Sequence, residues 1–341
     1  MNRINLVMLA WVICFLSIAG YTNITLAQNQ VGTTAAAFLE IPVGPRAIGM
    51  GQAYVASAND VSALYWNPAG IALLDNNQAT FQYTDWFIDT SLNYAAGVIK
   101  VNNAYFGANV YMFNGGTMDV TTVQFPDGTG EEFTINDISL GLSYAQKLKS
   151  NFSIGGTFKF IRTSLWRMDA NTFAVDLGFH YKTPIENLDL GFSITNFGGE
   201  LELEGDNVAR RIDLDPNASG NNDAIIANLD TDSWDLPLFF RIGLAYKMLK
   251  ENNFHQLIIS SDAVYPNSNN NYVNVGLEYG FRDMVFLRAG YSYMFLDRDD
   301  GTGHLRAGFG IKVIDQITAD YAFSDRSILG SVHTLGAAVN F

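Results

Sequence analysis

The chain has 341 residues, a formal net charge of −14, and a composition that is 48% hydrophobic, 13% aromatic and only 16% charged. Soluble domains usually carry about 25% charged residues, so this composition argues against an ordinary soluble domain. The acidic balance also argues against nucleic-acid binding, because Lys and Arg neutralise the phosphate backbone in such complexes.

The first residues have the pattern of a secretory signal peptide. Arg3 gives a basic start, residues 6–19 are apolar, and residues 25–27 include the small residues of a cleavage site. We therefore predict a signal peptide over residues 1–27 and export of the rest of the chain. The single cysteine, Cys14, lies within it, so disulfides and thiolate metal sites are not expected in the exported protein.

Residues 28–76 are punctuated too often by glycine and proline for a long helix or strand. Examples are the run from Pro42 to Gly51 and the Asn67–Gly70 turn. We predict that this segment forms a plug, or hatch, of short helices and turns in the mouth of a barrel.

Residues 77–341 alternate between apolar and polar side chains. Leu305, Phe309 and Ile311, for example, alternate with Arg306 and Lys312. Segments of about ten residues with this period, and no run of 18 apolar residues, are typical of strands that span an outer membrane. The pattern predicts an all-β transmembrane barrel of about 14 antiparallel strands. The expected spans are 77–84, 90–101, 103–113, 133–148, 151–166, 170–182, 187–198, 236–249, 254–265, 271–281, 284–295, 302–313, 315–324 and 331–341.

The connections between these segments are unequal at the two ends of the barrel. Those assigned to the periplasm are short: 102, 149–150, 183–186, 250–253, 282–283 and 314. The other set includes the longer loops 114–132, 199–235, 266–270, 296–303 and 325–330. Short turns on one side and long loops on the other are typical of outer-membrane barrels. The strand 331–341 is expected to pair with 77–84 and close the sheet.

Charged residues fall on the strand face opposite the apolar one. A Lys or Arg that faces lipid at mid-membrane costs about 2–4 kcal/mol, so these side chains are expected to face the lumen. Most of them are expected only to fill or hydrate the interior. The set is Asp176, His180, Lys182, Arg241, Lys247 and Glu278.

The sequence offers no motif for catalysis or for a cofactor. The four histidines, His180, His255, His304 and His333, lie on separate strands without metal-ligand spacing. Ten acidic residues lie in the loop 199–235, and calcium prefers oxygen ligands, but their spacing matches no calcium-binding loop. We therefore expect no enzyme, no cofactor and no metal, and interpret this acidic loop as solvated, with calcium binding as the alternative.

Two stretches carry a resemblance to a known family. Residues 38–56, FLEIPVGPRAIGMGQAYVA, and 60–70, DVSALYWNPAG, closely resemble the N-terminal signature of the PorV/PorQ family of outer-membrane proteins of the Bacteroidetes type. The resemblance implies a FadL-like barrel whose N-terminal segment enters the lumen. It also implies a link to type IX secretion, in which PorV-like members bind the C-terminal signals of exported proteins and pass them to the attachment machinery.

The signature residues are expected to have a structural role in the plug. The glycines permit tight backbone paths and Pro68 fixes a turn. Buried charges need partners, so Arg46 and Asp60 should find oppositely charged groups. The simpler interpretation is a rigid plug, and the alternative is a plug that acts as a gate. The candidate site residues are Gly44, Arg46, Gly49, Gly51, Asp60, Asn67, Pro68, Ala69 and Gly70.

Two functions compete at this point. The first is a barrel in the cell outer membrane that supports type IX protein secretion or surface attachment by binding exported proteins or partner subunits. The second is a FadL-like transporter of hydrophobic small molecules. A continuous apolar pocket from the outer loops to the plug would favour transport. A lumen filled by paired charges and plug side chains would favour interaction.

Overall fold

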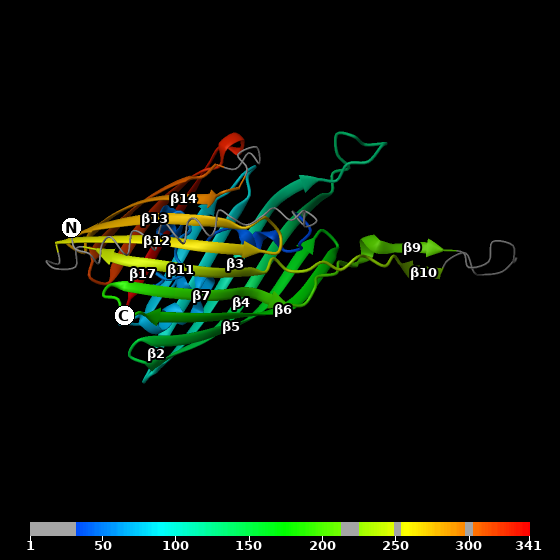
Figure 1. Cartoon of the computed structure of the whole chain (residues 1–341). Coiled ribbons are helices and arrows are strands. Elements are labelled where there is room, and N and C mark those ends of the chain that lie inside the picture. The colour runs from blue at the N-terminus through cyan, green and yellow to red at the C-terminus, as the bar shows by residue number, and fades with distance from the viewer. Residues whose placement is uncertain (1–31, 213–224, 249–253, 297–302) are drawn as a thin grey trace, which may run out of the picture.

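The computed structural model describes residues 32–212, 225–248, 254–296 and 303–341, which form a closed β-barrel with a chain segment inside it (Figure 1). Fourteen strands make the wall, each antiparallel to its neighbours. They are β1 (Gln78–Asp85), β2 (Ser91–Val101), β3 (Ala104–Asp119), β4 (Glu132–Lys149), β5 (Phe152–Leu165), β6 (Met168–Lys182), β7 (Leu188–Gly198), β11 (Phe239–Met248), β12 (His255–Pro266), β13 (Tyr272–Phe281), β14 (Val285–Met294), β15 (Leu305–Ile314), β16 (Ile317–Asp325) and β17 (Ser331–Asn340).

The sheet closes between its first and last strands, as predicted. β1 pairs with β17 from Gln78 opposite Asn340 to Asp85 opposite His333. The side chain of Gln78 also donates to Asn340 Oδ1 at 2.9 Å. Closure pairs the backbone groups of both edge strands, which a wall surrounded by hydrocarbon requires.

Side chains alternate between the outside and the lumen along each strand. On β6, Phe173 and Leu177 are exposed on the outer surface, whereas Asp176 and His180 are buried inside. Arg241 and Glu278 are buried on the inner face as predicted. The register therefore places an apolar surface outside and the charged groups within, in agreement with the cost of exposing charge to lipid.

The two ends of the barrel differ as the sequence predicted. Short turns, such as those after Val101, Lys149 and Ile314, lie at the end where the C-terminus is labelled (Figure 1). We call this the short-turn end and the opposite one the long-loop end. The predicted turn 250–253 lies outside the described residues.

The long loops hold more structure than expected. β3 continues to Asp119, beyond its predicted end. The acidic loop 199–235 contains β8 (Glu204–Gly205), which pairs with β6, and the short 3-10 helix η3 (Asp206–Val208). It also contains a two-stranded ribbon of β9 (Ala209–Ile212) and β10 (Ile225–Asn228), which projects past the barrel (Figure 1). Another short 3-10 helix, η5 (Ser327–Leu329), lies between β16 and β17.

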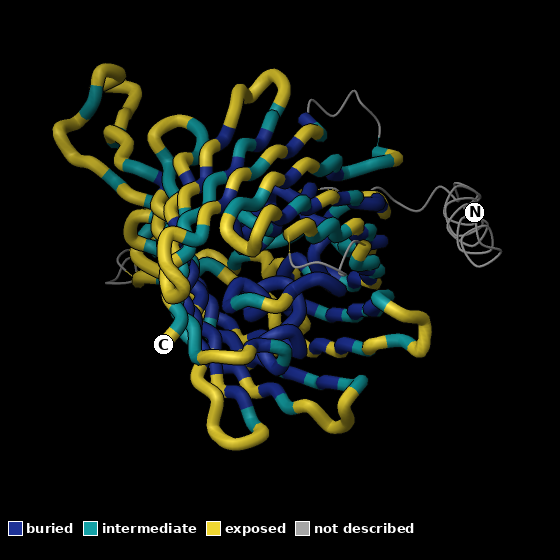
Figure 2. The backbone as a smooth tube through the Cα atoms, turned by 90° about the vertical axis from the view of Figure 1, so that its left-hand side faces the viewer, coloured by how far each residue is buried: buried dark blue, intermediate teal, exposed yellow. Residues whose placement is uncertain are grey.

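Residues 32–76, which we call the inner segment, lie inside the barrel (Figure 2). They contain short helices: η1 (Ala37–Glu40), α2 (Pro45–Gly49), α3 (Ala63–Trp66) and η2 (Pro68–Leu73). Within the described residues, none of the helices has the length and apolar character needed to cross a membrane. The predicted signal peptide, residues 1–27, lies outside the described residues.

The inner segment runs from one end of the barrel to the other. The N–H of Ala35 donates to the carbonyl of Asp235, shortly before β11 at the long-loop end, at 2.9 Å. At the short-turn end, Asn77 accepts from the N–H groups of Lys100 at 2.8 Å and Phe341 at 3.0 Å. The chain is thus threaded through its own barrel before it becomes the first strand.

Candidate functional site

The nine candidate residues all lie in the inner segment and form two groups. In the first group, Arg46, Gly49 and Gly51 pack on β13 to β15, Gly44 donates to Gln82 on β1, and Asp60 contacts the inner segment itself. In the second group, Asn67, Pro68 and Ala69 pack on β5 and β6, and Gly70 packs on Ala58 and Ala63 of the inner segment. The first group is Gly44, Arg46, Gly49, Gly51 and Asp60, and the second is Asn67, Pro68, Ala69 and Gly70.

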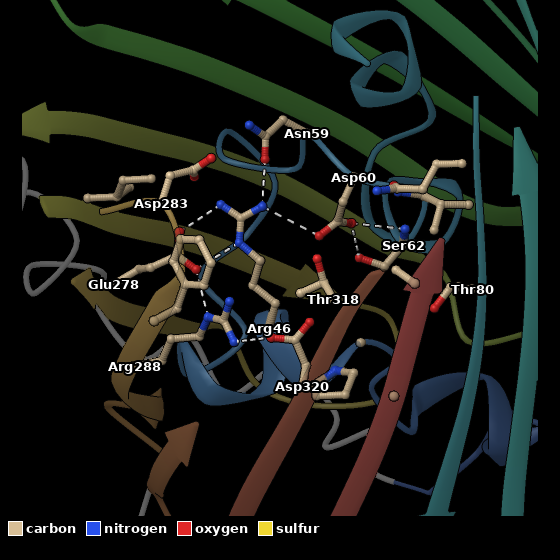
Figure 3. A pocket seen from close by; sticks show the side chains of 18 of the residues that line it. Arg46, Asn59, Asp60, Ser62, Thr80, Glu278, Asp283, Arg288, Thr318 and Asp320 are labelled. Carbon is tan, nitrogen blue, oxygen red and sulfur yellow. Dashed lines mark hydrogen bonds and ion pairs between the residues drawn. The ribbon is translucent and has the colours of Figure 1, made fainter. Parts of the chain in front are cut away.

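Arg46 is the centre of an ion-pair cluster with the wall (Figure 3). Its Nε and Nη2 atoms donate to the two carboxylate oxygens of Glu278 at 2.8 and 2.7 Å. Arg288 donates to the same carboxylate at 2.6 Å and to Asp320 Oδ1 at 2.5 Å. Asp60 lies 3.5 Å from Arg46 and completes the cluster. Each buried guanidinium is therefore matched by carboxylates, the arrangement in which buried charge is tolerated.

Asp60 is fixed by its own surroundings in the inner segment. One carboxylate oxygen accepts from the N–H of Ser62 at 2.9 Å and from its hydroxyl at 2.5 Å. The other accepts from the Tyr54 hydroxyl at 2.5 Å. The predicted partners of Arg46 and Asp60 are thus present, and the two residues also meet each other.

A polar cavity of about 650 Å³ lies beside the ion-pair cluster, toward the short-turn end of the barrel. Arg46, Glu278 and Arg288 form part of its wall (Figure 3), and Lys247 and Asp283 also line it. The cavity is therefore lined by charged groups and does not have the apolar character that a hydrophobic ligand needs.

Asn67 joins the second group to the barrel wall. Its amide nitrogen donates to the carbonyls of Val55 at 2.9 Å and Phe179 at 3.0 Å. Its oxygen accepts from the N–H of Ala69 at 3.2 Å, so the same side chain caps η2. Pro68 is the first residue of that helix, a position where its missing N–H costs nothing. The side chain of Asn67 is fully buried.

Two of the candidate glycines allow close approach to the wall. Gly51 has a φ of +63° and packs against the backbone of Gly290, and the Cα of Gly308 would lie 2.8 Å from a Cβ on Gly49. A side chain at either position would enter the wall, and at Gly51 it would also be strained.

The wall contributes glycines that the sequence analysis did not single out. At each of them an added Cβ would lie within 3.0 Å of an atom of the inner segment, so the wall is fitted to that segment around its circumference. The signal in the sequence is glycine at a lumen-facing position near the middle of a strand. The positions are Gly107, Gly155, Gly178, Gly191, Gly243, Gly276, Gly290, Gly308 and Gly336.

Polar side chains of the wall also bind the backbone of the inner segment. Asp262 accepts from the N–H groups of Tyr54 and Val55 at 2.7 and 2.9 Å. The Tyr111 hydroxyl donates to the carbonyls of Phe38 and Ile41 at 2.9 and 2.7 Å. These side chains satisfy backbone groups that would otherwise be buried without partners.

The histidines and the acidic loop show no arrangement for chemistry in the described residues, where no group of three or more His, Cys, Asp or Glu side chains could hold a metal. His333 contacts the Tyr321 hydroxyl at 2.7 Å on the outer surface of the wall. Three acids of the loop, Asp213, Asp215 and Asp223, lie outside the described residues, so the calcium alternative stays a hypothesis.

Comparison with solved structures identifies the fold. A FadL homologue from Pseudomonas aeruginosa has a TM-score of 0.54 at 15% identity, covering 88% of this chain and 99% of that one. The toluene transporter TodX of Pseudomonas putida has a TM-score of 0.55 at 15% identity over 87% and 96% of the two chains. The toluene transporter TbuX of Ralstonia pickettii has a TM-score of 0.54 at 12% identity, over 87% and 97%.

Comparison of sequences identifies the family. Among curated proteins, none matches the chain significantly. The model of a protein family described as "Type IX secretion system protein PorV" matches residues 24–222, which is more than half of the chain. The chain therefore belongs to the PorV family of type IX secretion proteins and folds as a FadL-like outer-membrane barrel.

Proposed function

We propose that this barrel supports type IX secretion by binding exported proteins or partner subunits at its long-loop end, without enzymatic activity. In this proposal residues 1–27 are removed on export, residues 28–76 act as a rigid plug, and residues 77–341 form the barrel. Membership of the PorV family supports a role in type IX secretion. The inner segment that fills the lumen supports binding of a partner over conduction of a small molecule.

The observation that carries the proposal is the packed middle of the lumen. Met50, Tyr54, Leu64 and Trp66 of the inner segment are completely or almost completely buried. Wall glycines, the ion-pair cluster and Asn67 hold this segment on several sides. Moving it to open a path would break buried ion pairs and hydrogen bonds together, which makes a stationary plug the better interpretation.

The long-loop end provides a surface for a protein partner. Val123 and Phe125 are exposed in the connection between β3 and β4, and Ile226 is exposed on the β9–β10 ribbon. Exposed apolar groups on projecting elements, rimmed by polar residues, are typical of protein interaction sites.

One observation favours transport of hydrophobic molecules as the second candidate. The barrel has the fold of two proteins named as toluene transporters. Against it, the cavity of about 650 Å³ is lined by charged groups.

The test compares a gene deletion with three complementing genes: wild type, a variant with residues 206–229 replaced by a short Gly/Ser linker, and the Gly97→Ala variant as a control. We expect the deletion to change the set of secreted and surface-attached proteins. We expect the ribbon variant to restore it incompletely and Gly97→Ala to restore it fully, because no atom lies within 4 Å of a Cβ at Gly97.

An unchanged set of exported proteins after deletion would overturn the proposal. Uptake of radiolabelled toluene, measured in the same strains, would support the second candidate if it fell on deletion while secretion stayed normal.

A further inference from the structure

A cluster of aromatic and basic side chains lies on the outer surface of the barrel, where β12 begins and β13 ends at the short-turn end. We call it the short-turn cluster, and its members are Phe254, His255, Tyr279, Phe281 and Arg282. His255 lies directly opposite Phe281 on the neighbouring strand. Phe254 and Phe281 are exposed on the outside of the wall. The cluster therefore lies at a level where aromatic and cationic side chains meet lipid head groups.

The guanidinium of Arg282 lies beside two rings of this cluster. It is 5.4 Å from the ring centre of Phe254 and 5.3 Å from that of Phe281. In the described part of the chain, no carboxylate lies within 4.0 Å of it, because the carboxylate of the adjacent Asp283 contacts Lys312 instead, at 3.2 Å. Rings that cover the planar face of a guanidinium leave its N–H edge for an acceptor.

His255 and Tyr279 form a hydrogen-bonded pair beside this guanidinium. The Nδ1 atom of His255 lies 2.7 Å from the Tyr279 hydroxyl, and the ring of His255 also packs on Phe281, which contacts Arg282. A neutral histidine has one N–H and a tyrosine has one O–H. The pair uses one of these two donors internally, so the other is available to a ligand in either tautomer of the imidazole.

The same residue types recur at the opposite end of the wall with a different outcome. In this long-loop cluster, which comprises Tyr321, Phe323 and His333, His333 lies opposite Phe323 and 2.7 Å from the Tyr321 hydroxyl. Its second ring nitrogen contacts the Ser331 hydroxyl at 3.3 Å, and the residue opposite it on β1 is Asp85. Both ring nitrogens are thus occupied beside an acid, so this cluster does not suit an anion.

An apolar strip continues from the short-turn cluster toward the middle of the wall. Leu257 lies opposite Tyr279, and Ile259 lies opposite Leu277 in the next pair along the same face. Ile259 and Leu277 are exposed on the outer surface. A ligand with a polar group at the cluster could therefore extend an acyl chain over this strip, where burial of apolar surface is favourable.

We propose that the short-turn cluster binds the phosphate group of a membrane phospholipid, with an acyl chain along Ile259 and Leu277. A phosphodiester fits because its two free oxygens accept from the fork of Arg282 and from the available donor of the His255–Tyr279 pair, and its negative charge is opposite to that of the guanidinium. A phospholipid is favoured over a soluble phosphate because the donors adjoin an apolar surface that the fold exposes to the membrane.

The experiment uses native mass spectrometry of the purified full-length barrel, released from a neutral detergent, to measure the affinity of the first bound lipid. The probes are dioleoyl phosphatidylglycerol, dioleoylglycerol, which has the same chains and no phosphate, and inorganic phosphate. The test variants are Arg282→Gln and Tyr279→Phe. Their matched controls are Arg162→Gln, which removes an exposed arginine from the outer face of β5, and Tyr321→Phe in the long-loop cluster.

We expect the wild type to bind dioleoyl phosphatidylglycerol more tightly than dioleoylglycerol. Arg282→Gln should weaken the affinity for the phospholipid at least about tenfold, the effect of losing one charge-assisted hydrogen bond. Tyr279→Phe should weaken it about fivefold, the effect of losing one neutral hydrogen bond, and it keeps the test valid if Arg282→Gln fails to fold. Arg162→Gln and Tyr321→Phe should bind like the wild type.

Equal affinities of the wild type for the two lipids would overturn the proposal, because the phosphate would then not be recognised. Equal losses in Arg282→Gln and Arg162→Gln would also overturn it, since any exposed arginine would have the same effect, as would equal losses in Tyr279→Phe and Tyr321→Phe. Binding of inorganic phosphate as tightly as the phospholipid would assign the cluster to a soluble anion and contradict a lipid site.

Discussion

The two halves of the lumen treat buried charge in opposite ways. Toward the short turns, Arg46 and Arg288 are matched by Glu278 and Asp320, and the network joins the inner segment to three strands. Toward the long loops, Arg306 has buried donors without partners. The first set of charges therefore joins the inner segment to the wall, whereas Arg306 joins only neighbouring parts of the wall through the carbonyls of Gly303 and Asp325.

The largest effect is expected from Glu278→Gln. The change leaves Arg46 and Arg288 without their shared acid, and removing one partner of a buried ion pair typically costs about 3–5 kcal/mol. Chemical unfolding of the refolded barrel in lipid vesicles measures the loss. Asp283→Asn is the control, because that exposed carboxylate contacts only Lys312 at 3.2 Å among the described residues. A loss below about 1 kcal/mol for Glu278→Gln would mean that the cluster does not hold the structure.

Gly290→Ala tests whether the wall is fitted to the inner segment. The new Cβ would meet the backbone of Gly51 and Met50, which cannot yield as a flexible side chain would. Overpacking of this kind costs about 1–3 kcal/mol. Hydrogen exchange should become faster in residues 45–56. A Cβ at Gly97 meets no atom within 4 Å, so the Gly97→Ala variant should exchange like the wild type. Identical exchange in the two variants would contradict close packing of the wall on the inner segment.

A smaller loss of about 1–2 kcal/mol is expected from Asn67→Ala, because the helix η2 loses its cap and the carbonyls of Val55 and Phe179 lose a donor. The same unfolding measurement applies. Asn93→Ala is a suitable comparison, since this residue faces the outer surface of β2. If the two variants unfolded alike, Asn67 would not join the inner segment to the wall.

The smallest effect is expected from Arg306→Met, a change in the free energy of unfolding within about 1 kcal/mol. An apolar side chain of similar length removes a buried charge with two donors that lack a hydrogen-bond partner, which offsets the three lost hydrogen bonds. Arg288→Met, at a comparable depth but paired, should lose several times more. Equal losses of unfolding free energy in Arg306→Met and Arg288→Met would contradict the distinction between the two halves of the lumen.

The sequence was sufficient to predict the barrel because the period-two pattern repeats strand after strand. The parity of Asp176 and His180 on β6, the short turns and the closing strand are all as expected. The cost of burying a charge also predicted that Arg46 would need a charged partner. The partner, Glu278, lies 232 positions away, and only the register of a closed sheet brings the two together.

Other features had weaker signals. The β9–β10 ribbon lies in an acidic stretch without regular alternation, so no pattern separates it from a loop. A glycine such as Gly276 can serve a strand or a close contact, and the sequence does not distinguish these uses. The sequence predicted that Arg306 lies on the polar face of its strand. It could not predict that two of its donors lack a partner, because the partners of a buried side chain depend on tertiary packing.

The threaded path of the inner segment has a consequence for how the protein is built. Residue 35 is tied to one end of the barrel and residue 77 to the other, while β1 and β17 meet from positions about 260 residues apart. Such distant pairing is slow to form. If β1 and β17 paired first, the inner segment would have to pass through a closed barrel whose wall contacts it too closely to admit side chains. The packing therefore favours an order of assembly in which the strands fold around the inner segment and β1 pairs with β17 last. The inner segment then acts as a template for the wall.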